Sequence, residues 1–144
     1  MKKTTGELLE ILKKESTLNR YIETVSDNLI EQVPLSDCLN RLIEKKGLKK
    51  TDIICQSGLE RKYAYQIFNG QKRPNRDRVL ALCLAMRLSL EETQTLLRQT
   101  GYSPLYARLK QDSVIIFCLQ HTLSTMDAND LLYEMGEPLL TLTS

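Results

Sequence analysis

Long side chains with hydrogen-bonding ends gather on one short segment of this sequence, residues 61–69. Outside its apolar positions the segment carries six such residues: Arg61, Lys62, Tyr63, Tyr65, Gln66 and Asn69. The apolar positions Ala64, Ile67 and Phe68 recur at three- and four-residue spacing, which predicts an α-helix with one buried and one polar side. A helix fits the DNA major groove, where arginine, lysine and glutamine can bind base edges. The segment therefore predicts a helix that contacts bases.

A second short helix precedes this one and would fix its position. Ile53 and Ile54 supply an apolar face within about 50–57, Gly58 then breaks the pattern, and Leu59 follows as an apolar plug. Glycine tolerates the positive φ that a helix needs when it ends in a sharp turn. The two segments together predict a helix-turn-helix.

Positive charge is concentrated around the same stretch. Residues 41–78 hold eleven basic and four acidic residues, a net +7, whereas the rest of the chain holds nine basic and fourteen acidic residues, a net −5. A charge run is usually only a solvated face, but this excess coincides with the predicted helix-turn-helix. It favours a polyanionic partner bound in one orientation.

The composition is that of an all-helical soluble protein. The chain has 144 residues, of which 42% are hydrophobic and 26% charged, with six glycines and four prolines. Its longest apolar run, 79–86, is too short to span a bilayer, and the N-terminal segment has no signal-peptide core. Four widely spaced cysteines are typical of free thiols in a reducing compartment. We expect a cytoplasmic protein with no membrane partner.

Cap and turn residues divide the chain into further helices. We expect one or two amphipathic helices within 1–33, the first capped by Thr4 to Glu7 and a weaker second one between Leu18 and Leu29. Ser36 would cap a helix over about 36–46, and Asn75 would cap one over about 76–86. A further helix would follow Ser89 and run to about Thr100. A long helix would begin at Pro104, and the last would follow Ser124 and end at Gly136.

The last part of the chain repeats the part before it. Residues 76–102 shifted by 35 fall on 111–137 without a gap, so that Asp77 meets Asp112 and Gly101 meets Gly136. This register predicts a repeated two-helix unit. From residue 112 onward the sequence has five acidic residues and no lysine or arginine, so the second copy suits packing or protein pairing better than phosphate.

Residues 47–74, GLKKTDIICQSGLERKYAYQIFNGQKRP, with their flanking helices, resemble the lambda-repressor-like, XRE/Cro-type helix-turn-helix domain. The resemblance covers about 35–101. It implies five short helices, the third in the major groove, and the function of the bacterial and phage transcription regulators that bind as dimers. We therefore expect an all-α fold: an N-terminal helical extension (1–33), a five-helix lambda-repressor-like DNA-binding domain (34–102) and a C-terminal repeated helical hairpin (103–144).

The resemblance also implies roles for individual residues. By position, the base-reading side of the third helix would be Arg61, Lys62, Tyr65 and Gln66. The contacts to the sugar-phosphate backbone would be Lys50, Asn69, Lys72 and Arg73.

Three positions depart from the family pattern. Ile54 stands where the family prefers a small residue, and Ala64 stands where it prefers a branched aliphatic one. Because the two sites face each other in that fold, we expect an exchange of volume between them. Ser57 replaces a commonly apolar residue, and nothing in the sequence explains it.

Simpler interpretations remain open. The polar side of 61–69 could be only a solvated face, and Tyr63 and Tyr65 could pack on the surface instead of contacting DNA. Cys118 and His121 could share a metal, but no further ligands accompany them, and Cys55 is more simply a passive thiol than a redox sensor. No catalytic or cofactor-binding motif is present, so we expect no enzyme, no cofactor and no metal.

The resemblance and the charge distribution together predict a sequence-specific regulator of transcription. It would bind double-stranded DNA as a homodimer and act as a repressor, with the C-terminal helices used for dimerisation or signal input. One alternative keeps the fold but makes it a protein-interaction module, such as an antitoxin or antirepressor partner that binds a protein through its C-terminal helices. Another is non-specific nucleoid binding.

Overall fold

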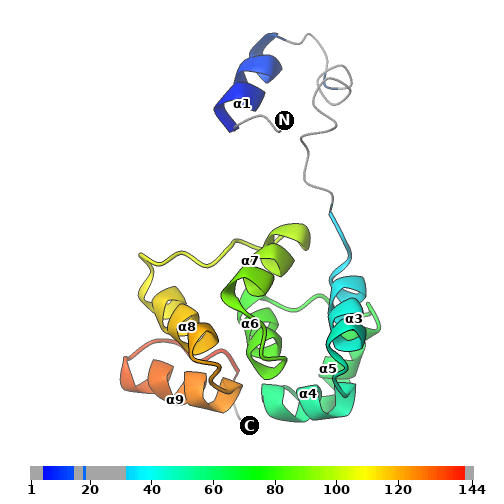
Figure 1. Cartoon of the computed structure of the whole chain (residues 1–144), viewed down its shortest axis with the longest axis vertical. Helices are drawn as coiled ribbons and strands as arrows, with labels where there is room; N and C mark the ends of the chain where they lie inside the picture. The colour runs from blue at the N-terminus through cyan, green and yellow to red at the C-terminus, as the bar shows by residue number, and fades with distance from the viewer. Residues whose placement is uncertain (1–4, 15–17, 19–31, 142–144) are drawn as a thin grey trace. The chain divides into compact units, whose positions relative to one another are not determined.

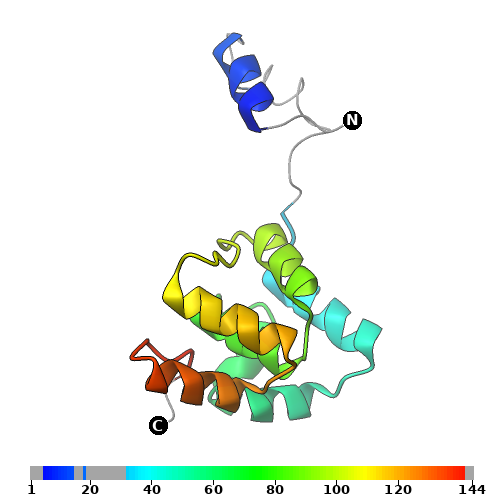
Figure 2. The same cartoon turned by 60° about the vertical axis from the view of Figure 1, so that its left-hand side comes forward.

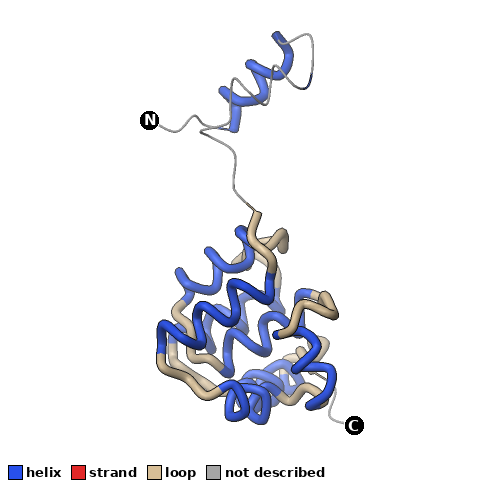
Figure 3. The backbone as a smooth tube through the Cα atoms, turned by 90° about the vertical axis from the view of Figure 1, so that its right-hand side faces the viewer, coloured by secondary structure: helices blue, strands red, loops and turns tan. Residues whose placement is uncertain are grey.

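The computed structural model describes residues 5–14, 18 and 32–141, and over these residues the chain forms helices and no strand (Figure 1 and Figure 3). The prediction of an all-α protein is therefore confirmed for this part of the chain. The helices are α1 (Thr5–Lys14), α3 (Leu35–Lys46), α4 (Lys50–Ser57), α5 (Arg61–Phe68), α6 (Arg76–Ala85), α7 (Leu90–Gln99), α8 (Lys110–Gln120) and α9 (Thr125–Glu134).

The chain forms two compact units, residues 1–31 and residues 32–144. The first contains α1, whose Leu9 is exposed. The cap expected at Thr4 and the helix expected between Leu18 and Leu29 lie outside the described residues, apart from Leu18 itself. The second unit contains α3 to α9, so the domain boundary expected at 102/103 lies inside it. None of the described helices is both long and apolar enough to cross a membrane.

Three predicted helix starts are confirmed by their cap hydrogen bonds. Asn75 accepts a hydrogen bond from the N–H of Arg78 at the start of α6. Ser89 and Glu92 form a reciprocal capping box before α7, and Ser124 and Asp127 form the same box before α9. These starts could be predicted because the partners in each cap lie three residues apart.

One predicted cap, Ser36, and one predicted start, Pro104, are wrong. Helix α3 begins at Leu35 directly after Pro34, whose carbonyl accepts the first helical bond from Cys38, so Ser36 lies inside the first turn and does not cap it. Helix α8 begins at Lys110 instead of Pro104. The Gln94 side chain binds both the N–H and the C=O of Leu105, at 2.6 and 3.0 Å, and these bonds keep that segment out of a helix.

Helix α6 forms the centre of the second unit. It contacts α4 on one side and α8 and α9 on another, and every residue from Val79 to Met86 is buried (Figure 1). A helix that is apolar all round is expected in such a position. In Figure 2, α8 and α9 lie side by side, and α9 continues along the line of α4, which it contacts.

The 35-residue repeat extends to backbone conformation and hydrogen bonds. Arg87 and Thr122, 35 residues apart, are the non-glycine residues with positive φ among those described, at 56° and 55°. Asn129 accepts a hydrogen bond from the N–H of Leu140, just as Gln94 does from that of Leu105. Hairpins α6–α7 and α8–α9 therefore share a local design.

Candidate nucleic-acid interface

The turn between α4 and α5 is held by a buried serine hydroxyl. Helix α4 ends at Ser57, and Gly58 follows with φ 77°, the left-handed conformation expected of it. Ser57 Oγ donates to the carbonyl of Ile54 at 2.7 Å and accepts from the N–H of Leu59 at 3.2 Å. The sequence did not explain Ser57, although serine is known for such local backbone bonds at helix ends. Here the hydroxyl fixes the direction in which α5 begins.

The inner side of α5 is anchored in the core. Ala64, Ile67 and Phe68 are at most 2% exposed. Asn40 of α3 donates a hydrogen bond to the carbonyl of Phe68 at 2.8 Å, which ties the C-terminal end of α5 to α3. Asn40 was missed by sequence reasoning because its partner lies 28 residues away.

The outer side of α5 brings the four expected base-reading residues together. Arg61 and Lys62 are exposed, and Tyr65 and Gln66 are half-buried. Positions four apart lie one above the other on a helix, and the Arg61 guanidinium is 5.9 Å from the centre of the Tyr65 ring. Tyr65 also packs against the hydrophobic core, so the row is open at Arg61 and Lys62 and partly covered at Tyr65 and Gln66. We refer to these four residues as the α5 outer face.

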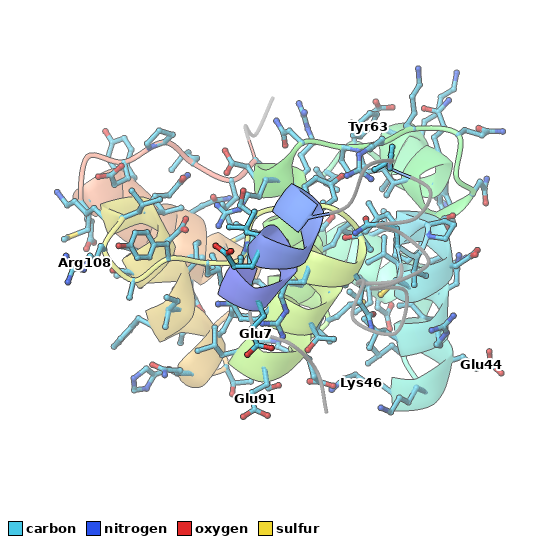
Figure 4. All side chains as sticks on the ribbon, turned by 90° about the horizontal axis from the view of Figure 1, so that it is seen from above. Glu7, Glu44, Lys46, Tyr63, Glu91 and Arg108 are labelled. Atoms are coloured by element: carbon cyan, nitrogen blue, oxygen red, sulfur yellow. The ribbon has the colours of Figure 1, made fainter. Side chains whose placement is uncertain are left out.

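Tyr63 lies differently. The residue is half-buried, and the Arg78 guanidinium of α6 lies 5.3 Å from the centre of its ring. Figure 4 labels Tyr63 on the side of the unit opposite to Lys46. Its contact with α6 makes Tyr63 a packing residue between α5 and α6.

The residues expected to contact phosphates fall into two groups. Asn69 and Lys72 are exposed in the turn after α5, and Lys50 lies at the first turn of α4 with its Nζ 5.1 Å from the Phe68 ring. Arg73, in contrast, donates to the carbonyl of Thr100 at 2.8 Å and stacks 4.3 Å from the Tyr102 ring. Arg73 is thus already engaged in joining the turn to the end of α7.

Two further basic residues of the positive stretch form internal ion pairs. Arg76 binds both carboxylate oxygens of Asp112 at 2.8 and 3.0 Å, and Lys46 lies 3.0 Å from Glu92. Burial opposes ionisation of Asp112, but hydrogen bonds from the Arg76 guanidinium and the Tyr106 N–H lower its pKa. These two cations therefore contribute little to an external field.

The remaining basic residues of 41–78 supply the positive surface around α4 and α5. Lys50 is half-buried and the others are exposed: Arg41, Lys45, Lys49, Arg61, Lys62, Lys72 and Arg78. A hollow of about 330 Å³ between α4 and α5 borders the α5 outer face and is lined by Cys55, Leu59, Arg61 and Tyr65 among others.

The cysteines and the histidine do not build a metal site in the described part of the chain. Cys118 is buried while His121 is exposed, and no group of three potential ligands occurs among the described residues. Burial raises the pKa of the Cys38 and Cys118 thiols and that of Cys83 to about 12. Cys55 is the exposed thiol of the four.

Comparison with protein-family models, with curated proteins and with solved structures gives no match for this chain.

Proposed function

We propose that this chain is a sequence-specific double-stranded DNA-binding repressor of transcription, with α3 to α7 arranged as a lambda-repressor-like, XRE-type domain. The observation that carries the proposal is the α5 outer face. A short helix is anchored on its inner side by three core residues and the Asn40 bond, and its outer side carries a polar row that is exposed at Arg61 and Lys62 and half-exposed at Tyr65 and Gln66. Rigid support with an open polar row is what direct readout in the major groove requires.

The side chains of the α5 outer face suit a DNA site that contains both G·C and A·T base pairs. Arg61 and Lys62 can donate to the O6 and N7 acceptors of guanine, and Gln66 can bind the N6 and N7 edge of adenine. Lys62 and Gln66 are four residues apart, about 6 Å along the helix, so they would reach different base pairs. Lys72 and Asn69 beyond the end of α5, with Lys50 at the start of α4, would hold the flanking phosphates.

The charge distribution would orient the protein on DNA. Eight basic residues of 41–78 lie outside the internal contacts of Lys46, Arg73 and Arg76, whereas residues 112–144 carry five carboxylates and no lysine or arginine. Hairpin α8–α9 would therefore stay away from phosphate. Because one recognition helix reads only a few base pairs, the chain would bind a palindromic site as a homodimer.

Selection of bound duplexes from a random pool tests this function, since it reports sequence preference, palindromy and half-site spacing together. Arg61→Ala or Gln66→Ala should each relax the preference at one base position at a cost of about 1–3 kcal/mol. Lys72→Ala should weaken binding to all duplexes alike and reduce the slope of log K against log salt by about 1.

Arg108→Ala provides the matched control. Arg108 is exposed and precedes α8, and Figure 4 shows it across the unit from Tyr63 of α5. The variant should bind the selected duplex like the wild type. If no duplex is bound at low salt, or if all three interface variants bind like Arg108→Ala, the proposal is wrong.

A different observation supports a second candidate function. Large apolar side chains are exposed on hairpin α8–α9: Phe117, Met126, Tyr133 and Met135. Such side chains favour a protein-interaction module, for example an antitoxin or antirepressor partner. A stable hetero-complex together with absence of duplex binding at low salt would favour this candidate over the first.

A further inference from the structure

Hairpins α6–α7 and α8–α9 pack on each other through equivalent faces. Arg76 of the first hairpin binds Asp112 of the second, and Asp77 of the first interacts with the side chain of Gln111 of the second. Residues 111 and 112 are the equivalents of 76 and 77 in the 35-residue repeat, so the contact is reciprocal. Reciprocal contacts are the mark of a two-fold arrangement, here within one chain.

The contact at the C-terminal ends of α6 and α8 is also between equivalent residues. Arg87 Nη1 donates to the carbonyl of its own equivalent, Thr122, at 2.6 Å. Equivalent residues therefore meet at both ends of α6 and α8, which places the two helices side by side in the same direction. The hairpins are related by a pseudo-two-fold axis that runs along them.

Pseudo-symmetry makes the outer faces of the two hairpins comparable, and they differ sharply in exposure. In the first hairpin the outer face is at most 3% exposed and consists of Leu82, Ala85, Met86, Leu96 and Thr100. The equivalent residues of the second hairpin, which we call the open face, are Phe117, Gln120, His121, Leu131 and Met135. Phe117 is 49% and Met135 48% exposed, and Phe117 stacks on His121 with ring centres 4.2 Å apart.

In the first hairpin, the neighbouring helix on the α7 side is α3. Helix α3 and the segment before it run along α7: Val33 donates to the carbonyl of Gln99 at 2.9 Å, and Lys46 at the end of α3 pairs with Glu92 at 3.0 Å. Lys46 is labelled in Figure 4 at this end of α3. An amphipathic helix with a lysine at its C-terminal end thus accompanies the buried face.

The second hairpin also has an acidic residue at the position that Glu92 holds in the first. The equivalent of Glu92 is Asp127, which holds the same third position of a capping box and is exposed. The end of α9 adds Glu134, and the sequence from residue 112 onward provides no lysine or arginine to pair with either. The open face therefore combines apolar side chains with two carboxylates, Asp127 and Glu134, that take part in no ion pair among the described residues.

We propose that the open face binds an amphipathic helix of a partner protein, with apolar residues on one side and a lysine or arginine at its C-terminal end. This helix takes the position on α8–α9 that α3 occupies on α6–α7, with its terminal cation at Asp127. A second copy that presents the same face suits it less well, because the carboxylates of the two copies would then meet. The proposal does not rest on DNA binding, since it concerns a different face.

The α3 sequence itself supplies the probe. A peptide of residues 34–47 with Cys38→Ser, stapled between positions 41 and 45, which are exposed in α3, is first verified as helical by circular dichroism. It is then titrated into the full-length, isotope-labelled chain. We expect saturable chemical-shift changes that centre on Phe117, Leu131 and Met135.

Three variants make the test specific. Phe117→Ala/Met135→Ser should weaken peptide binding at least about tenfold, because both apolar contacts are removed. Asp127→Asn keeps an oxygen for the cap but loses the charge, and should weaken binding by up to about fivefold. Asp130→Asn is the matched control: Asp130 is exposed on α9 outside the open face, and its equivalent Thr95 is exposed on the first hairpin.

Several results would overturn the proposal. A helical peptide that causes no saturable shift at the open face would do so, and so would binding that the double variant leaves unchanged. A homodimer that the double variant converts to monomer would show that a second copy occupies the face instead. Duplex binding by α5 is measured separately, so failure of one proposal is distinguishable from failure of the other.

Discussion

At the scale of single residues, Ser57 shows how one hydroxyl can fix the relation between two helices. It is fully buried, and both of its hydrogen bonds go to backbone groups of the turn, the carbonyl of Ile54 and the N–H of Leu59. An apolar residue at this place would leave the Leu59 N–H without that partner. The serine therefore stabilises the turn that aims the α5 outer face.

We predict that Ser57→Ala lowers the free energy of unfolding by about 1–2 kcal/mol, because one buried hydrogen-bonding group loses its partner. Urea denaturation followed by circular dichroism measures the change. Ser103→Ala is the control, since Ser103 is exposed and only its backbone carbonyl is used, by Arg76. Equal stability of Ser57→Ala and wild type would contradict the role given to this hydroxyl.

Residue placement could be predicted from the sequence wherever it depends on local periodicity. The helix repeat alone puts Arg61, Lys62, Tyr65 and Gln66 on one side, because the buried positions of α5 fix the other side. The internal contacts of Arg73 could not be predicted. Its partner Thr100 is 27 residues away, and only the folded arrangement of α5 and α7 brings the two together.

At the scale of elements, the ion pair of Arg76 with Asp112 joins α6 to α8. The Asp112 side chain is 2% and that of Arg76 23% exposed, and Asp112 also accepts the N–H of Tyr106. Removing one partner leaves the other charge largely buried. Asp112→Asn should therefore cost about 3 kcal/mol of unfolding free energy at neutral pH.

The same pair predicts a pH dependence. Because the folded-state pKa of Asp112 is lowered, its stabilisation is present above the ordinary carboxyl pKa and is lost as the pH falls below about 4. Asp77 acts in the opposite direction, since burial raises its pKa. The wild type should thus lose stability on acidification more steeply than Asp112→Asn, as measured by urea midpoints across pH 2–6.

Asp130→Asn serves as the control for both measurements. Asp130 is exposed on α9 and takes part in no ion pair among the described residues. Its variant should keep the neutral stability and the acid slope of the wild type. A wild-type slope that survives in Asp112→Asn would mean that this carboxylate is not the group responsible.

The packing of α4 on α5 gives a second prediction at this scale. Ile54 is 3% and Ala64 0% exposed, and both belong to the same core cluster. If the large residue on α4 compensates for the small one on α5, Ala64→Ile alone should overpack and destabilise by about 1–3 kcal/mol. Ile54→Ala/Ala64→Ile should recover part of that loss. Thermal unfolding of the wild type and of both variants measures these changes, and a neutral Ala64→Ile would contradict the exchange of volume.

Helix boundaries, too, could be predicted from the sequence where their cause is local, and could not where the cause lies far along the chain. The capping boxes before α7 and α9 were predicted because both partners lie within one turn. The start of α8 was misplaced because a glutamine eleven residues earlier, Gln94, binds the backbone of Leu105. Pro104 is a local signal for a helix start, and here the hydrogen bonds from a side chain of α7 override it.

At the scale of the whole molecule, the second unit has one core instead of two. Helix α6 lies between α4 and the α8–α9 hairpin, and the Thr125 hydroxyl of α9 donates to the carbonyl of Ala81 within α6 at 2.8 Å. The sequence resemblance ends near residue 101, before α8 begins. The apolar surface of α6, however, is buried only when the second hairpin is present.

This arrangement predicts opposite effects for two truncations. A chain of residues 32–102 should lose cooperative thermal unfolding or aggregate, because it uncovers one side of α6 and leaves Arg76 without Asp112. A chain of residues 32–144 keeps the compact unit whole and should unfold cooperatively near the full-length midpoint. Calorimetry and light scattering on both chains measure the difference. Cooperative unfolding of 32–102 at a similar temperature would show that α8–α9 is an appendage, and the open face would then belong to a separate docking element.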